Sequence, residues 1–253
     1  MPRQEIVDAL GRLDDLTRRL RRECPWDREQ DERTIVPHTV EEAYELADAA
    51  NRGDDAKLLD ELGDVLFQVH FLSLLLEERG AGDLGRVAEH IRTKLVRRHP
   101  HVFGDVEAET AGEVLRNWDQ IKQDEPGRER GLFAEVPDNL PGPLYARKVQ
   151  RRAASSGFDP LGPEEAVQAV RAGADEADRD GSFESVGDLL FAAVNAARKL
   201  RVDPELALRA SADRFRARVE AAAALAEREG RSWADLDESE RLNYYAEARY
   251  RED

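Results

Sequence analysis

The chain has 253 residues, with 38 Lys and Arg against 54 Asp and Glu, so its formal net charge is −16. This acidic balance argues against binding to a nucleic acid polymer, because contacts to a phosphate backbone require an excess of basic side chains. The single cysteine, Cys24, excludes an internal disulfide framework and a cysteine-rich zinc site. With no signal peptide and no apolar run of about 20 residues, we expect a cytoplasmic protein that does not enter the membrane.

Helical periodicity dominates the sequence, and convincing β alternation is absent. The first helix is expected to start near Ile6 and to end before Cys24, and the helix over about 55–79 is expected to stop at Gly80. The apolar spacing predicts the following helices over about 39–51, 55–79, 84–98 and 111–122. The helix over 55–79 has an apolar side made of Leu58, Leu62, Val65, Leu66, Val69 and Leu72.

The texture of the sequence changes after residue 124, where proline and glycine cluster and apolar residues become few. Helical texture returns near residue 144 and continues to the end. We therefore predict a first domain over 1–125, a linker over 126–143 and a second domain over 144–253.

An internal repeat relates the two halves. The segment GDVLF at 63–67 returns 124 residues later as GDLLF at 187–191. Two more pairs keep the same order, Lys94 and Arg98 with Arg214 and Arg218, and Trp118 and Lys122 with Tyr245 and Arg249. A period of this length indicates a duplicated helical domain rather than a solenoid.

Four carboxylates form the sharpest constellation in the sequence. Glu42 and Glu45 are neighbours on one predicted helix face, and Glu61 and Asp64 are neighbours on the next. Both cross pairs are symmetric about Gly53, so an antiparallel hairpin turning there would bring all four to one height. Clustered carboxylates repel unless some are protonated or a cation lies among them, and ligands that are all oxygen suit Mg²⁺ or Mn²⁺.

An interpretation of the same residues without metal binding also stays open. Thr39 and Glu42 have the spacing of a capping box, so Glu42 could simply cap its helix. Each of the other acids could lie on a solvated face. Gly63, which lacks a side chain, would permit a neighbouring helix to approach closely.

Basic and aromatic residues form two further pairs. Lys94 and Arg98 are four residues apart and could clamp a polyphosphate, or could simply complement the dipole of their helix C-terminus. Trp118 and Lys122 have the same spacing and offer an aromatic surface and a cation on one face. The alternative for this pair is a core tryptophan with a solvated lysine.

These residues together resemble the MazG family of nucleoside triphosphate pyrophosphohydrolases, in the all-α NTP pyrophosphatase superfamily. The resemblance covers nearly the whole chain. Its motifs are CPWD at 24–27, EEAYE at 41–45, ELGDVLFQ at 61–68, KLVRRHPHVF at 94–103 and WDQIK at 118–122.

The resemblance implies an all-α fold of two tandem, related helical-bundle domains that assembles as a homodimer. It implies Mg²⁺-dependent hydrolysis of NTPs and dNTPs to the monophosphate and pyrophosphate, in the service of nucleotide-pool house-cleaning. By position, the metal ligands would be Glu42, Glu45, Glu61 and Asp64.

Other roles are also carried over by position. Lys94 and Arg98 would hold the phosphates, and Trp118 and Lys122 would close the nucleotide pocket. In the chemical step, Glu42 would orient or deprotonate the attacking water, and Lys94 would help to stabilise the charge on the leaving pyrophosphate.

The second half departs from the family pattern. Ser185 stands where the repeat would place the counterpart of Glu61, and the segment 168–174, where the matching ExxE pair should lie, contains no acid. Asp175, Glu176 and Asp178 lie further on, where a shifted alignment could recruit them, although we do not expect it. Asp188 alone is a poor metal site, so we expect this half to be catalytically degenerate. Two alternatives to the broad-specificity enzyme remain, a non-catalytic metal- or nucleotide-binding module and a narrower dUTP or phosphoribosyl-ATP pyrophosphatase.

Overall fold

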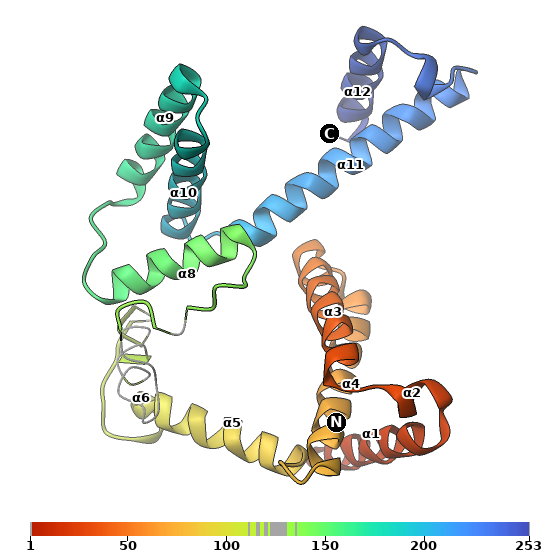
Figure 1. The fold of residues 1–253 in the computed structure, drawn as a ribbon, viewed down its shortest axis with the longest axis vertical. Helices are drawn as coiled ribbons and strands as arrows, with labels where there is room; N and C mark the ends of the chain where they lie inside the picture. The colour runs from red at the N-terminus through yellow and green to blue at the C-terminus, as the bar shows by residue number, and fades with distance from the viewer. Residues whose placement is uncertain are drawn as a thin grey trace. The chain divides into compact units, whose positions relative to one another are not determined.

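The computed structural model describes residues 2–110, 112–114, 117–118, 121, 131–134 and 136–252, and these are helical without a single strand (Figure 1). The all-α prediction is therefore confirmed. The chain forms two compact units, Met1–Gly127 and Arg128–Asp253. Of the described helices, none combines the length and the hydropathy that crossing a lipid bilayer requires.

The helices of the first unit follow one another with short connections. They are α1 (Arg3–Glu23), α2 (Pro25–Glu29), α3 (Glu32–Arg52), α4 (Asp55–Glu78), α5 (Leu84–Arg98) and α6 (Pro100–Phe103). The predictions over 55–79 and 84–98 are confirmed, with Gly80 left-handed at φ 71° beyond the end of α4. Of the helix predicted over 111–122, the described residues 112–114, 117–118 and 121 are helical.

Helix α3 begins seven residues earlier than the predicted start at Thr39. Asp31 caps it, because its carboxylate accepts hydrogen bonds from the backbone N–H groups of Arg33 (2.8 Å) and Thr34 (2.9 Å). The Thr34 hydroxyl completes a capping box by accepting from the backbone N–H of Asp31 (2.9 Å). The alternative that Glu42 caps this helix is therefore wrong, since Glu42 lies in its interior.

Asp31→Ala is expected to lower the free energy of unfolding by about 1 kcal/mol, because two N–H groups at the helix end lose their acceptor. The matched control is Thr39→Ala, whose hydroxyl bonds only the carbonyl of Ile35, at 3.4 Å. Urea unfolding followed by circular dichroism measures both. Equal stabilities for the two variants would contradict the assigned cap.

Helices α3 and α4 form an antiparallel hairpin that turns at Gly53, as the symmetry of the carboxylates predicts. Gly53 adopts the left-handed conformation (φ 68°), which glycine reaches without steric cost. Between the two helices, toward the end away from the turn, Ile35 of α3 and Phe71 and Leu75 of α4 form a buried cluster. This core holds the two helices in register.

The predicted apolar side of α4 is only partly covered within one chain, where Leu58, Val65 and Leu72 are half-buried. Leu62 is 49% exposed, Leu66 37% and Val69 38%, and Leu59 on the same stripe is 75% exposed. Gly63 permits a close approach that no described helix of the chain makes, because a Cβ there would meet no heavy atom within 4 Å. The exposed stripe of α4 (Leu59, Leu62, Leu66 and Val69) is thus free to contact another surface.

The second unit also contains a hairpin of two packed helices. Its helices are α8 (Gly142–Ser155), α9 (Pro163–Asp180), α10 (Phe183–Lys199), α11 (Pro204–Arg228), the 3₁₀ helix η1 (Trp233–Asp235) and α12 (Glu238–Glu252). Helices α9 and α10 pack together and turn at Gly181, which is left-handed at φ 60°. A Cβ on Gly173 would lie 3.2 Å from the Leu189 Cα, so these two helices approach closely there.

The repeated pentapeptides occupy the same place in the two hairpins. GDVLF lies on α4 and GDLLF lies on α10, each on the second helix after a left-handed glycine. The domain limits at 125 and 144 stay a prediction, and α8 already begins at Gly142.

Candidate metal centre

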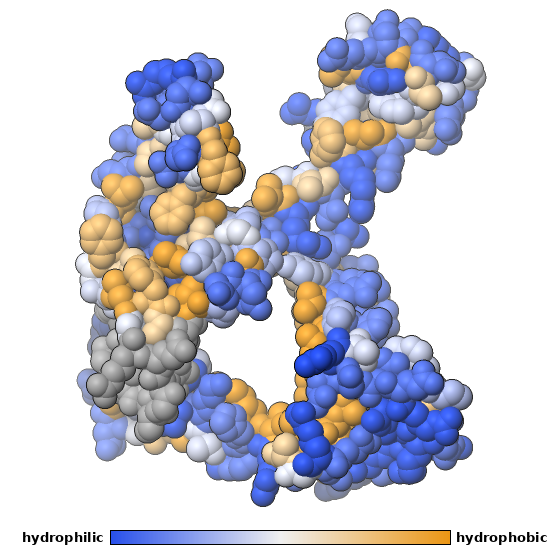
Figure 2. All heavy atoms as spheres, viewed as in Figure 1, coloured by the Kyte–Doolittle hydropathy of each residue, from blue (hydrophilic) through white to orange (hydrophobic). Residues whose placement is uncertain are grey.

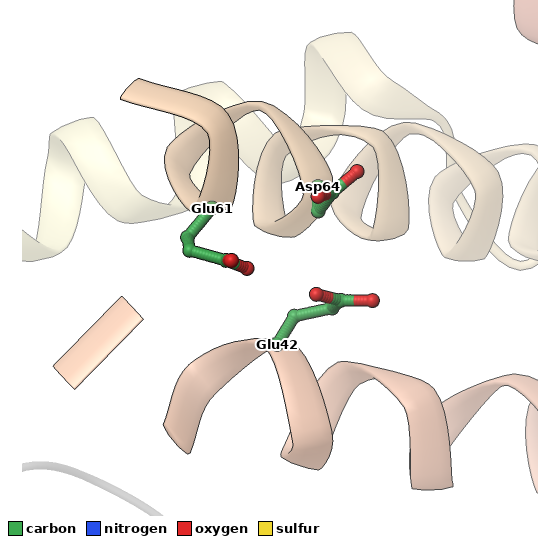
Figure 3. Close-up of side chains that lie close together, drawn as sticks. All are labelled: Glu42, Glu61 and Asp64. Carbon is green, nitrogen blue, oxygen red and sulfur yellow. The ribbon is translucent and has the colours of Figure 1, made fainter. Parts of the chain in front are cut away.

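Three of the predicted ligands meet between α3 and α4. Glu42 projects from α3 toward Glu61 and Asp64 on α4 (Figure 3). One carboxylate oxygen from each residue lies within 4.8 Å of the other two. Glu61 is only 1% exposed, Glu42 is half-buried and Asp64 is exposed. The hairpin therefore collects acids from two helices at one partly buried point.

Glu45 borders this cluster through Lys57, a residue that the sequence analysis did not select. The Lys57 ammonium forms an ion pair with Glu61 and lies 3.8 Å from the Glu45 Oε2. Lys57 is four residues before Glu61 on α4, so helical spacing could have revealed the pair. All four predicted ligands thus lie in one electrostatic network.

The cluster shifts the pKa values of its members in opposite directions. Burial, followed by the negative charges of Asp64 and Glu61, raises the pKa of Glu42. The ammonium group of Lys57 lowers the pKa of Glu61 and outweighs the effect of burial. The negative charge of Glu42 is therefore opposed by its surroundings, whereas that of Glu61 is stabilised by Lys57.

The donor set fits a hard divalent cation. Its possible ligands are all carboxylate oxygens, which Mg²⁺ and Mn²⁺ prefer. Both oxygens of Glu61 are buried; Oε1 pairs with the Lys57 ammonium, whereas Oε2 has no hydrogen-bond partner among the described residues. A cation among these oxygens would offset the burial and the repulsion that together raise the pKa of Glu42.

Gln68 is a second residue that the sequence analysis did not select. It follows Glu61 and Asp64 at helical spacing on α4 and is 7% exposed. Its Oε1 is buried and finds no hydrogen-bond partner within the described part of the chain. The face of α4 that carries the acids therefore continues into an unpaired amide oxygen.

The predicted phosphate and base contacts form a separate group. The Arg98 guanidinium lies 5.3 Å from the centre of the Trp118 ring, and the His99 ring packs edge-on against Trp118 at 4.9 Å. Arg98 is 5% exposed, and Lys94 lies one turn earlier on α5, half-buried. Lys122, the fourth predicted contact, lies outside the described residues.

This basic group is distant from the carboxylates within one chain. Helix α5 follows the end of α4 opposite the Gly53 turn and leads away from the hairpin (Figure 1). At 1.5 Å per residue, the stretch of α4 from Asp64 to Glu78 alone spans about 21 Å. None of the contacts given above joins the basic group to the carboxylates.

The second hairpin lacks the acids at the matching height. Symmetry about Gly181, which the contact between Gly173 and Leu189 supports, places Ala177 level with Ser185 and Ala174 level with Asp188. Ser185 is 5% exposed, and its hydroxyl donates a hydrogen bond to Asp180 (2.6 Å). In the described part of the chain, three clustered metal-ligating side chains occur only in the first unit.

Comparisons with known proteins identify relatives along most of the chain. The family model of the MazG nucleotide pyrophosphohydrolase domain matches residues 30–103. A nucleoside triphosphate pyrophosphohydrolase from Escherichia coli K12 is 41% identical over 229 residues, covering 84% of this chain and 86% of that protein.

Two further relatives come from Thermotoga maritima. A nucleoside triphosphate pyrophosphohydrolase/pyrophosphatase MazG is 35% identical over 252 residues, which covers 96% of this chain and 94% of that protein. A crystal structure of a mazG-related protein aligns with 44% of this chain and 97% of its own, at 25% identity and a TM-score of 0.39.

Proposed function

Because the chain belongs to the MazG family and is a nucleoside triphosphate pyrophosphohydrolase, we propose that it cleaves NTPs and dNTPs with a divalent cation bound in the first hairpin. The products would be the nucleoside monophosphate and pyrophosphate. The observation that carries the proposal is the convergence of Glu42, Glu61 and Asp64 within 4.8 Å. Membership of this family favours the enzyme over a non-catalytic module.

In this proposal, Glu42, Glu61 and Asp64 hold the cation, which is Mg²⁺ or Mn²⁺, and Glu45 completes the set. Bound there, the cation would offset negative charge on the substrate and lower the pKa of a water molecule. Glu42 is suited to orient that water or to take its proton, because it is half-buried and projects into the cluster (Figure 3).

The basic group supplies the complementary half of the site. Lys94 and Arg98 would bind phosphate oxygens, and Lys94 would stabilise the charge that develops on pyrophosphate. Trp118 already packs against the Arg98 guanidinium, which fixes the direction of this side chain. Trp118 and Lys122 would close the pocket over the nucleoside.

Addition of Mg²⁺ or Mn²⁺ is expected to raise the melting temperature by several degrees. A ligand that binds only the folded state at about 100 times its Kd adds about 2.7 kcal/mol of stability. Differential scanning fluorimetry with each cation measures the shift. Glu61→Gln is the control and should lose most of it, because Glu61 is the most buried acid of the cluster.

Hydrolysis must respond to the same cations. With EDTA present, release of pyrophosphate from a mixture of dNTPs should stop, and added Mg²⁺ should restore it. Full activity in EDTA would contradict a metal-dependent mechanism. Competition between dUTP and the other dNTPs distinguishes broad specificity from the narrower alternative, and nucleotide pools in a deletion strain test the house-cleaning role.

We also propose a homodimer, because one chain leaves the apolar stripe of α4 in solvent. Leu59, Leu62, Leu66 and Val69 follow one helix face, and Gly63 beside them leaves room for a neighbouring backbone. Two copies that pack these stripes together would complete a helical bundle. The basic group of one subunit could then face the carboxylates of its partner.

A mixing experiment tests this sharing of the site. Glu61→Gln and Lys94→Met are each expected to have strongly reduced activity as pure proteins. After subunit exchange, a mixed dimer contains one site with both defects and one site with none, so mixing should restore part of the parental activity. A mixture with no gain in activity would contradict shared sites, and sedimentation as a monomer would contradict the dimer.

A further inference from the structure

The second unit contains a cavity of about 510 Å³ that the hydrolysis in the first hairpin does not use. Helices α8, α9 and α10, the connection between α8 and α9, and Phe133, which precedes α8, form its walls. Its volume falls in the range of about 300–1,000 Å³ that small-molecule sites occupy. The acids of a metal site are absent from this hairpin, so the cavity has to be explained by other chemistry.

The residues that line the cavity are mainly apolar, and three of them are phenylalanines. Phe133, Phe158 and Phe191 line it, and they are 46%, 69% and 47% exposed. Figure 2 shows apolar side chains on the surface of this part of the chain. Exposed rings that surround a hollow favour a flat aromatic ligand, which can stack on them and remove their surface from water.

One buried polar atom on the wall lacks a partner. Gln150 on α8 is 7% exposed, and its Nε2 donates a hydrogen bond to the backbone carbonyl of Phe191 (2.8 Å). Its Oε1 is buried and has no hydrogen-bond partner among the described residues. Because a buried acceptor is costly to leave unpaired, this atom calls for a donor from a bound molecule.

The charges around the cavity disfavour an anionic ligand. Asp159 and Asp188 are acidic, and the only basic side chain among the described lining residues is Arg198. The Arg198 guanidinium already donates to the Asp159 carboxylate (2.6 and 3.3 Å) and to the side chain of Asn195 (2.8 and 3.1 Å). The Lys199 ammonium also lies 2.8 Å from the Asp159 Oδ1, so a phosphate group would meet Asp188 and cations that already pair with a carboxylate.

We propose that this cavity binds an uncharged nitrogen heterocycle with N–H donors, the chemistry of the base of a nucleoside, without a metal ion. The base would stack on the phenylalanine rings and donate a hydrogen bond to the Gln150 Oε1. Asp188, which also lines the cavity, is a second acceptor for an N–H or hydroxyl group of the ligand. The second unit would thus bind a nucleoside in preference to the triphosphate that the first unit hydrolyses.

Binding is to be measured on the full-length protein in EDTA by isothermal titration calorimetry and saturation-transfer NMR. The probes are adenosine, guanosine, cytidine and thymidine, each compared with its triphosphate. At least one nucleoside is expected to bind, and its triphosphate is expected to bind at least about tenfold more weakly, because Asp188 repels phosphate and the cations beside Asp159 already pair with that carboxylate. No binding of any nucleoside at millimolar concentration, or equal binding of the triphosphate, would overturn the proposal.

Variants locate the site within the chain. Gln150→Leu should weaken binding by about tenfold or more, since it removes the buried acceptor. Phe158→Ala should weaken it several-fold through lost stacking, and its exposed position makes misfolding a small risk. Glu61→Gln should leave nucleoside binding unchanged, because it alters only the first unit. Binding that survives both cavity variants, or that Glu61→Gln abolishes, would place the ligand elsewhere.

Discussion

Replacing Glu61 by Gln is expected to lower the rate of pyrophosphate release by about 100-fold or more while the protein stays folded. The amide has nearly the shape of the carboxylate but lacks its charge. Glu61 is the most deeply buried acid of the cluster, and it stands between Lys57 and the oxygens of Glu42 and Asp64. Loss of this charge removes a ligand and leaves Lys57 beside the remaining carboxylates, where it would compete with a cation.

The control for this prediction is Ser185→Ala in the second hairpin. Ser185 occupies the position of the repeat that matches Glu61, but it only bonds Asp180 and Ser182 near its own helix start. Its loss should leave turnover within a few-fold of the parent. Steady-state rates with Mg²⁺ and circular dichroism are measured for all three proteins. A folded and fully active Glu61→Gln protein, or an inactive but folded Ser185→Ala protein, would move the active site out of the first hairpin.

The hairpin that carries the acids could be predicted because its signals are local. Spacings of three place Glu42 with Glu45 and Glu61 with Asp64, and Gly53 marks a turn that needs a left-handed residue. Helix length and antiparallel packing then determine which residues face each other. The meeting of Glu42, Glu61 and Asp64 follows from these features without knowledge of the rest of the fold.

The start of α3 was placed too late because two local signals compete. Pro37 lies inside the helix, although proline usually occurs in the first turn, and Thr39 with Glu42 imitates a capping box. The helix begins at the earlier position because the Asp31 carboxylate accepts hydrogen bonds there from two N–H groups that would otherwise be free. Capping rules select candidate positions, and the packing of Ile35 against Phe71 decides between them.

The exposure of the α4 stripe could not be predicted from periodicity, which identifies an apolar face but not the surface that covers it. In this chain the opposite face of α4, with Glu61 and Gln68, packs toward α3. A helix with a buried glutamate on one side and exposed leucines on the other is expected to make a further contact. The distance between the basic group on α5 and the carboxylates has the same explanation if a partner subunit supplies that contact.

Lys94→Met is the last prediction, and it tests the basic half of the site. Methionine keeps an unbranched stem but has no charge, so the variant loses a charge-assisted bond to phosphate worth about 1.5–3 kcal/mol. The expected result is a fall in kcat/KM of about 10- to 100-fold. Because Lys94 is also assigned to the charge on leaving pyrophosphate, kcat should fall together with substrate affinity.

Arg92→Met is the matched control on the same helix. Arg92 is exposed and pairs with Glu89 on its own helix surface, so its replacement removes a positive charge from α5 without removing a phosphate contact. If both variants lose activity equally, the loss in Lys94→Met reflects only the overall positive charge of α5. If neither loses activity, the phosphates bind elsewhere. A loss confined to Lys94→Met would place the substrate between α5 and the carboxylates of the hairpin. Because these two groups lie far apart within one chain, a substrate could contact both only if α5 of one subunit lies beside the hairpin of its partner.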